Sequence, residues 1–134
     1  MGASGWHYVT EFDGNVEASV ARLQARVFQE EWADEFESLE ALWADEEFMG
    51  TEGTHSILDV DPAGLRRIPA ARVLHHFGTD SPTAARFEEV VSQANERYAD
   101  SLLDEFDTSW SGRYLVLHTD GRPTHLGLFG SSGD

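Results

Sequence analysis

The chain of 134 residues contains no cysteine, which excludes disulfides, thiolate metal sites and a thiol nucleophile. It has no apolar run close to the roughly 20 residues that a membrane-spanning helix needs. The segment Met1–Trp6 shows neither the basic nor the apolar region of a secretory signal. These absences lead us to expect a cytoplasmic protein with no membrane partner.

Lysine is absent too, so all nine side-chain cations are arginines. Together with frequent alanine and glycine, this coding bias indicates a GC-rich bacterial genome. No arginine falls between Arg26 and Arg66, although twelve of the 25 acids do. The formal net charge of the chain is −16. A field of this sign attracts basic partners and repels nucleic acid and anionic lipid, so we expect no direct nucleic-acid partner.

The chain does contain enough large apolar side chains for a core. Hydrophobic residues make up 40%, and they include eight Phe, four Trp and three Tyr. This composition argues against global disorder. The length fits a single domain, which we expect to span residues 1–134. Its last four residues, 131–134, are small or polar and are expected to form a frayed tail.

The first half of the chain predicts two strands separated by helices. Residues 6–12 are aromatic and β-branched, which is typical of a strand. Asn15 is a suitable cap for a helix that runs to about Trp32. A short helix over 36–43 would bury one apolar face and expose a face of acids. Residues 54–60 are expected to form the second strand.

The second half predicts two helices and a hairpin. Pro69 and Gly78 are suited to begin and end a helix that buries Val73, Leu74 and Phe77. Ser81-Pro82 would open the longest helix, on which apolar residues from 87 to 106 recur at helical spacing.

Asp120-Gly121 between two apolar runs is a strong hairpin signal. A two-residue turn would place Leu115 opposite Leu126 and put four leucines on one face, namely Leu115, Leu117, Leu126 and Leu128. Tyr114, His118 and His125 would lie on the other face. Pro123 would need an edge or bulge position. The expected fold is therefore α+β, ordered β-α-α-β-α-α-β-β, with a mixed or antiparallel sheet and helices on one face.

His118 and His125 are the best-placed pair for a metal or a ligand, with Tyr114 on the same face. The predicted register makes the two imidazoles diagonal neighbours. Zinc would need a third protein ligand, which the sequence does not identify, so no cofactor is predicted. The alternative is an ordinary half-exposed sheet face with two unremarkable histidines.

Other catalytic patterns are weaker. In a strand, His55 and Ser56 would face opposite ways, so the run from Thr54 to Asp59 is not expected to form a catalytic triad. The neighbouring carboxylates of Glu46-Glu47 and Glu88-Glu89 would point apart on a helix. No calcium-binding loop of the EF-hand type is present. An enzyme is therefore the less favoured class.

The acidic stretch has no such ordinary explanation. Ten acids between residues 30 and 52 lack an interleaved cation, so they forgo the i,i+4 ion pairs that usually support exposed helices. Trp32 is equally compatible with an interface and with the core, whereas Phe36 and Trp43 fit the core better. The residues predicted to bind a partner are Glu30, Glu31, Trp32, Asp34, Glu35, Glu37, Glu40, Asp45, Glu46 and Glu47. A halophilic or merely solubilising surface is the alternative.

The central part of the chain resembles a pattern of small uncharacterised bacterial proteins. The residues concerned are Gly53-Thr54-His55-Ser56-Ile57-Leu58-Asp59, a Pro-opened helix, Phe77-Gly78-Thr79 and Ser81-Pro82-Thr83, followed by the Asp-Gly hairpin. The resemblance implies a compact α+β domain of the kind encoded near toxins or secretion systems. It implies no catalytic residue.

Three functions remain in view. The first is an acidic interaction module, most concretely an immunity or antitoxin-type inhibitor of a basic effector such as a toxin or nuclease. The second is a small enzyme or a metal- or ligand-binding domain that uses the face of His118 and His125. The third is a DNA mimic, which shares the acidic surface and differs only in its partner. The oligomeric state is left open.

Overall fold

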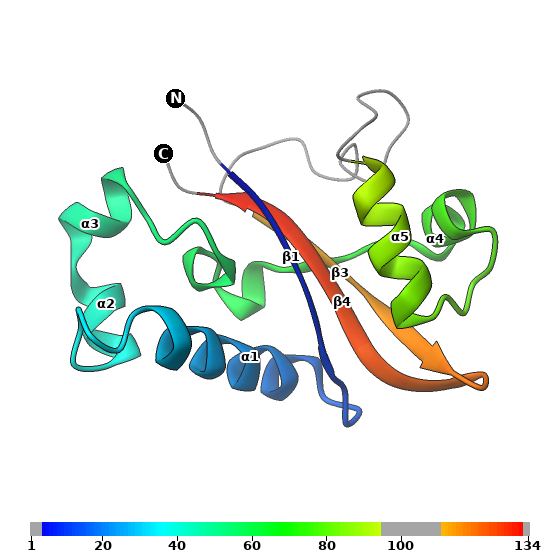
Figure 1. Cartoon of the computed structure of the whole chain (residues 1–134), viewed down its shortest axis with the longest axis horizontal. Coiled ribbons are helices and arrows are strands. Elements are labelled where there is room, and N and C mark those ends of the chain that lie inside the picture. Colours follow the sequence, from blue (N-terminus) through cyan, green and yellow to red (C-terminus); the bar gives the residue numbers. More distant parts are fainter. Residues whose placement is uncertain (1–3, 95–110, 133–134) are drawn as a thin grey trace.

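The computed structural model describes residues 4–94 and 111–132, and they fold around a four-stranded mixed sheet (Figure 1). The strand order is β1-β4-β3-β2. The strands are β1 (Ser4–Glu11), β2 (Arg66–Arg67), β3 (Ser111–Thr119) and β4 (Arg122–Ser132). β4 is antiparallel to β1 and β3, whereas β2 is parallel to β3. The expected α+β class with a mixed sheet is confirmed.

Among the described residues, five α-helices connect the strands, and several of their ends follow local signals. They are α1 (Val16–Glu31), α2 (Leu39–Ala44), α3 (Glu46–Thr51), α4 (Ala70–Phe77) and α5 (Ala84–Ala94), with 3-10 turns η1 (Ile57–Asp59) and η2 (Pro62–Gly64). The Asn15 side chain accepts a hydrogen bond from Ala18 N and so caps α1, as predicted. Gly78 ends α4 with a positive φ of 74°, which also confirms the prediction.

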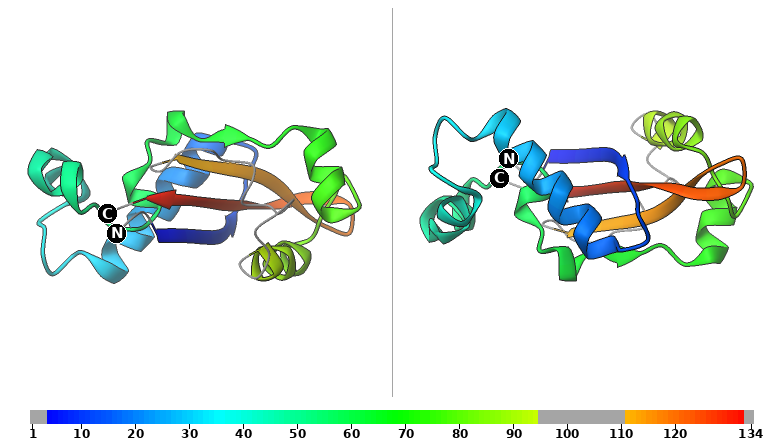
Figure 2. Two further views of the ribbon diagram at one scale, coloured as in Figure 1. Left: turned by 90° about the horizontal axis from the view of Figure 1, so that it is seen from above. Right: turned by 90° about the horizontal axis from the view of Figure 1, so that it is seen from below.

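Helices cover both faces of the sheet, which corrects the expectation that they lie on one face only. Figures 1 and 2 show α1 against one face and α4 with α5 against the other. Each face has its own core. The core under α1 includes Leu126 and Leu128, and the core under α4 and α5 includes Leu115 and Leu117. The four leucines predicted to share a face are thus divided between two cores.

A β-bulge explains this division. The turn at Asp120 and Gly121 forms as predicted, with φ angles of 52° and 79°. The register then shifts between Leu117, which pairs with His125, and His118, which pairs with Pro123. Pro123 thus lies beside a bulge, as its missing N–H requires. Beyond the shift, Leu115 pairs with Gly127 rather than Leu126, and a one-residue slip moves a strand's side chains to the opposite face.

Two glycines of β4 let aromatic rings lie directly on the sheet. A Cβ on Gly127 would come within 2.8 Å of the Phe87 ring, and one on Gly130 within 2.6 Å of the Trp6 ring. Phe87 lies in the core under α5 and Trp6 in the core under α1. Large rings on both faces therefore depend on small residues in the central strand.

Other expectations need correction. Residues 54–60 form a loop and η1 rather than a strand, and the second strand is the short β2. The acidic helix begins at Leu39, capped by Ser38, so Phe36 precedes it. Leu74 is 54% exposed instead of buried. Ser131 and Ser132 belong to β4 rather than to a tail. The part of the predicted long helix from Tyr98 to Phe106 lies outside the described residues.

Candidate functional site

The acidic lobe, defined here as residues 30–52, comprises the end of α1, α2 and α3. In Figure 1, α2 and α3 lie at one end of the molecule, beyond the sheet. All ten of its carboxylates are exposed, and within residues 4–94 and 111–132 none forms an ion pair. Asp45 has a local role, because its Oδ1 accepts a hydrogen bond from Phe48 N at the start of α3. The other carboxylates are available to a partner.

The position of Glu30 and Glu31 is unfavourable for the helix that carries them. Both lie in the last turn of α1, and that turn contains no basic residue. The C-terminal end of a helix carries a partial negative charge, which disfavours acids by a few tenths of a kcal/mol to about 1 kcal/mol each. By contrast, Glu46 and Glu47 lie in the first turn of α3, where a negative charge is favourable.

Aromatic side chains hold the lobe together. Trp32, Phe36 and Phe48 form a cluster in which the ring centroids of Trp32 and Phe48 are 5.4 Å apart and those of Phe36 and Phe48 are 5.5 Å apart. Trp32 and Phe36 also pack against the core under α1. The Trp32 indole nitrogen is buried and has no hydrogen-bond partner among the described residues. The geometry therefore assigns Trp32 and Phe36 to packing.

Trp43 lies differently from the expectation that it is a core residue. Its side chain is 38% exposed, although its indole N–H donates to Leu58 O at 2.8 Å. Together with Met49 and Leu58 it lines a hollow of about 510 Å³ between the lobe and α1. Trp43 thus presents an oriented aromatic surface within the acidic lobe.

The residues from Thr54 to Asp59 form a hydrogen-bonded network, although not in the strand on which the sequence argument against a triad was based. The Asp59 carboxylate accepts from the backbone N–H groups of Thr54 and His55 at 2.7 and 2.9 Å, which folds this segment into a loop. The buried Ser132 hydroxyl donates to Asp59 Oδ2 at 2.7 Å and accepts from the Trp6 indole N–H at 2.9 Å. Asp59 and Ser132 therefore join the loop to the sheet.

Tyr8 lies beside this network. Burial raises the pKa of its hydroxyl above the ordinary value of 10.0, although hydrogen bonds with the Ile57 backbone and the Ser56 side chain act in the opposite direction. Ser56 Oγ also accepts from Leu58 N and so caps η1. The Ser56 hydroxyl also lies 2.6 Å from Thr54 Oγ1, so these side chains stabilise the loop.

The structure separates His118 from His125, which contradicts the predicted pair. His125 lies on the α5 side of β4, where its Nδ1 contacts Thr124 Oγ1 at 2.9 Å. His118 lines a different cavity, at the edge of β3. Tyr114 pairs with Leu128 and packs against the core under α1. Among the described residues, no group of three or more His, Asp or Glu side chains could hold a metal ion.

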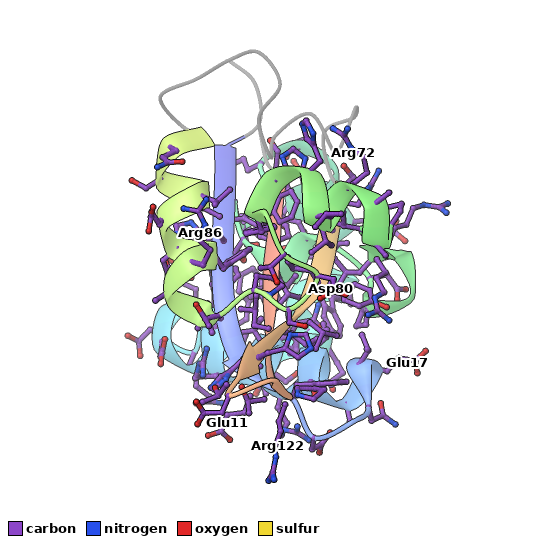
Figure 3. The ribbon with its side chains drawn as sticks, turned by 90° about the vertical axis from the view of Figure 1, so that its right-hand side faces the viewer. Glu11, Glu17, Arg72, Asp80, Arg86 and Arg122 are labelled. Atoms are coloured by element: carbon purple, nitrogen blue, oxygen red, sulfur yellow. The ribbon has the colours of Figure 1, made fainter. Side chains whose placement is uncertain are left out.

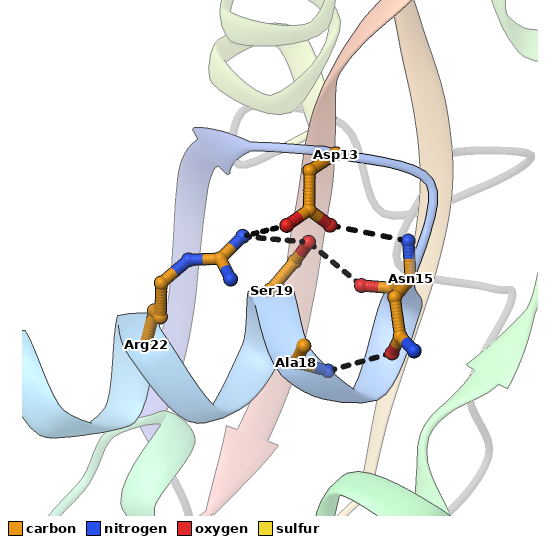
Figure 4. Close-up of polar contacts among 5 residues, drawn as sticks. All are labelled: Asp13, Asn15, Ala18, Ser19 and Arg22. Carbon is orange, nitrogen blue, oxygen red and sulfur yellow. Dashed lines mark hydrogen bonds and ion pairs between the residues drawn. The ribbon is translucent and has the colours of Figure 1, made fainter.

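The hollow beside His125 borders the start of α1. It has a volume of about 470 Å³ and is lined in part by Asp13, Arg22 and His125. Figure 4 shows the polar contacts there: Arg22 pairs with Asp13 at 3.1 Å, and Asp13 Oδ1 accepts from Asn15 N at 3.2 Å. The pKa of the Asp13 carboxyl is lowered from its ordinary 3.8. The hydrogen bond from the Asn15 N–H is the main cause, and the charge of the Arg22 guanidinium contributes less. The polar groups of this hollow therefore serve to cap the start of α1.

Compared with family models, with curated proteins and with solved structures, the chain shows no match. The resemblance to small bacterial proteins therefore stays a prediction, and the functional argument depends on the chain's own residues. Within the part of the chain that the structure describes, no helix has the length and apolar character to cross a bilayer.

Proposed function

We propose that the protein is an acidic interaction module whose acidic lobe binds the cationic surface of a basic protein. The observation that carries this proposal is the set of ten exposed carboxylates without an ion pair in the described residues. An ordinary surface mixes charges of both signs. Glu30 and Glu31 strengthen the argument, because they lie at a helix end where charge of this sign costs stability.

In its most concrete form, the proposal is an immunity or antitoxin-type inhibitor that acts by occlusion. The lobe would cover a groove that the basic effector, such as a nuclease, uses for its own anionic substrate. Charge complementarity gives such an encounter a fast association rate, which falls as salt is added. Trp43 supplies a large, oriented aromatic side chain of the kind that often anchors protein interfaces.

The test compares three immobilised proteins: the wild type, a lobe variant and a charge-matched control. The lobe variant carries Glu30→Gln, Glu31→Gln and Glu35→Gln. The control carries Glu11→Gln, Glu88→Gln and Glu89→Gln, which remove the same charge from exposed positions outside the lobe. Each is incubated with lysate of the native host at low and high salt. We expect a basic protein to bind the wild type and the control at low salt, and to be lost from the lobe variant.

Capture of no basic protein at low salt, or equal capture by all three proteins, would overturn the proposal. The captured protein also separates the first hypothesis from the DNA mimic. An inhibitor of one effector would bind a single toxin or nuclease and abolish its activity in a purified mixture. A DNA mimic would instead bind several unrelated DNA-binding proteins, each displaced by duplex DNA.

A further inference from the structure

A cavity of about 390 Å³ lies at the edge of β3, on the side of the molecule shown in Figure 3. Its walls come from three parts of the chain: the connection from β2 to α4, the loop between α4 and α5, and β3. The lining residues that matter below are Arg67, Pro69, Asp80, Leu115, Val116 and His118. This volume is in the range of pockets that bind small molecules.

The backbone of β3 has an unfilled position in this cavity. Ile68 N donates to Tyr114 O at 3.0 Å, and His118 N donates to Pro82 O at 2.8 Å, both on this edge of the strand. Since peptide groups alternate in direction along a strand, the N–H and C=O of Val116 point to the same edge. Neither group has a partner among the described residues. The gap exists because Pro69 leads the chain away from β3 into α4.

Both ends of the gap are closed, and this limits what can fill it. One end is occupied by Ile68 and the other by Pro82. From Tyr114 to His118 the strand rises by about 13 Å, at roughly 3.3 Å per residue. A strand of a partner protein would have to continue past one of these ends and would meet the chain there. About three extended residues fit.

The cavity is also lined by polar side chains, which include one positive and one negative charge, and by apolar side chains. The Nδ1 atom of His118 is buried and has no hydrogen-bond partner among the described residues. Arg67 is exposed at one wall and forms no ion pair in the described part of the chain. Asp80 is exposed in the α4–α5 loop, which Figure 3 shows in front of β3. Leu115 and Pro69 add apolar surface.

We propose that this cavity binds a free tripeptide. The N–H and C=O of the middle residue would complete the ladder at Val116, because two paired residues can exchange both backbone hydrogen bonds. The terminal carboxylate of the peptide pairs with Arg67, and its ammonium group pairs with Asp80. The His118 ring lines the cavity beside the bound peptide. This site uses none of the acidic lobe and is independent of the inhibitor function.

The experiment is a titration of the ¹⁵N-labelled full chain with trialanine, followed by NMR. Peptide is added to about 10 mM, ten times the Kd of about 1 mM expected for a ligand with so few contacts. We expect the amide resonance of Val116 and the ring resonances of His118 to shift together and to saturate. The same peptide with an N-methylated middle residue lacks the central donor and should bind about tenfold more weakly.

A pair of neighbouring arginines supplies the matched control. Arg67→Gln should weaken trialanine binding about threefold, the effect expected for an exposed ion pair, whereas Arg66→Gln, outside the cavity lining, should leave it unchanged. The proposal is overturned if Val116 does not shift at the highest concentration. It is equally overturned if N-methylation and Arg67→Gln have no effect on a shift that does occur.

Discussion

At the scale of single residues, buried polar side chains connect parts of the chain that are distant in sequence. Ser132 accepts from Trp6 and donates to Asp59, and so connects β4 and β1 to the segment 54–60, which contains η1. Gln24 of α1 donates to both Ile57 O and Val60 O, which attaches the same loop to the helix. A buried polar group left without its partner costs about 1–3 kcal/mol. The loop from Thr54 to Val60 therefore depends on a few identifiable hydrogen bonds.

Ser132→Ala is expected to lower the free energy of unfolding by about 1–3 kcal/mol, because the Trp6 indole loses its acceptor and Asp59 loses a donor. Urea denaturation at neutral pH measures this. Ser131→Ala is the control, because Ser131 is half-exposed and its side chain has no hydrogen bond in the described structure. Equal losses in the two variants would contradict the role given to Ser132.

The raised pKa of the Tyr8 hydroxyl leads us to expect that the protein loses stability in alkali. Burial raises the pKa of its hydroxyl above 10.0 in the folded protein. Between the unfolded and folded pKa values the folded state retains a proton that the unfolded state has lost, so stability falls as pH rises above about 10. Denaturation from pH 8 to 11 should show this decline, and Tyr8→Phe should remove part of it. An alkaline decline identical in Tyr8→Phe would refute the assignment.

At the scale of elements, the sequence predicted what neighbouring residues decide. Asn15 and Gly78 fix the ends of α1 and α4, and Asp120-Gly121 fixes the hairpin turn. The predictions that were wrong concerned features that depend on contacts between residues distant in sequence or on side chains. Residues 54–60 are as apolar and β-branched as a strand, but the Asp59 side chain bonds the Thr54 and His55 backbones and coils the segment.

The predicted register of the hairpin was wrong for a related reason. A β-bulge adds one residue near Pro123, and no sequence pattern gives its position. Because of this one residue, Leu115 pairs with Gly127 instead of Leu126, and His118 pairs with Pro123 while His125 pairs with Leu117. The cavity at β3 was also unpredicted. Its only sequence signals are the prolines at 69 and 82 that flank it, and they do not reveal that Val116 lies between them.

Glu30 and Glu31 give a prediction for α1. Glu30→Gln with Glu31→Gln should raise the free energy of unfolding by about 0.5–2 kcal/mol, because both charges oppose the helix dipole and adjoin other acids. Glu17→Gln, in the favourable first turn of the same helix, should lower it slightly. Thermal unfolding at low salt would measure both. If the double variant is less stable than the wild type, these acids have a stabilising role that the helix geometry does not show.

At the scale of the whole molecule, charge and packing are distributed unequally. The sheet has a core on each face, whereas the acidic lobe depends on a small aromatic cluster and carries ten acids. Its exposure was predictable from composition, but the absence of ion pairs within residues 4–94 and 111–132 was not, because an arginine distant in sequence could have lain beside it. Self-repulsion of this kind destabilises a compact state.

Added salt should therefore stabilise the protein. Screening shortens the Debye length from about 10 Å at 0.1 M to about 3 Å at 1 M, so the melting temperature should rise with NaCl over this range. The lobe variant with Glu30, Glu31 and Glu35 changed to Gln should show a smaller rise than the control variant changed at Glu11, Glu88 and Glu89. A melting temperature independent of NaCl in the wild type would contradict strong self-repulsion.

The pairing of β1 with β4 has a consequence for circular permutation of the chain. Ser4 lies opposite Ser132, at the same end of two neighbouring antiparallel strands. A short linker between these residues would therefore make a second hairpin, and the exposed turn at Gly121 could then serve as the new point of opening. Such a circular permutant would retain every strand neighbour of the sheet. The fold is thus defined by which strands lie side by side, and the same architecture accommodates more than one starting residue.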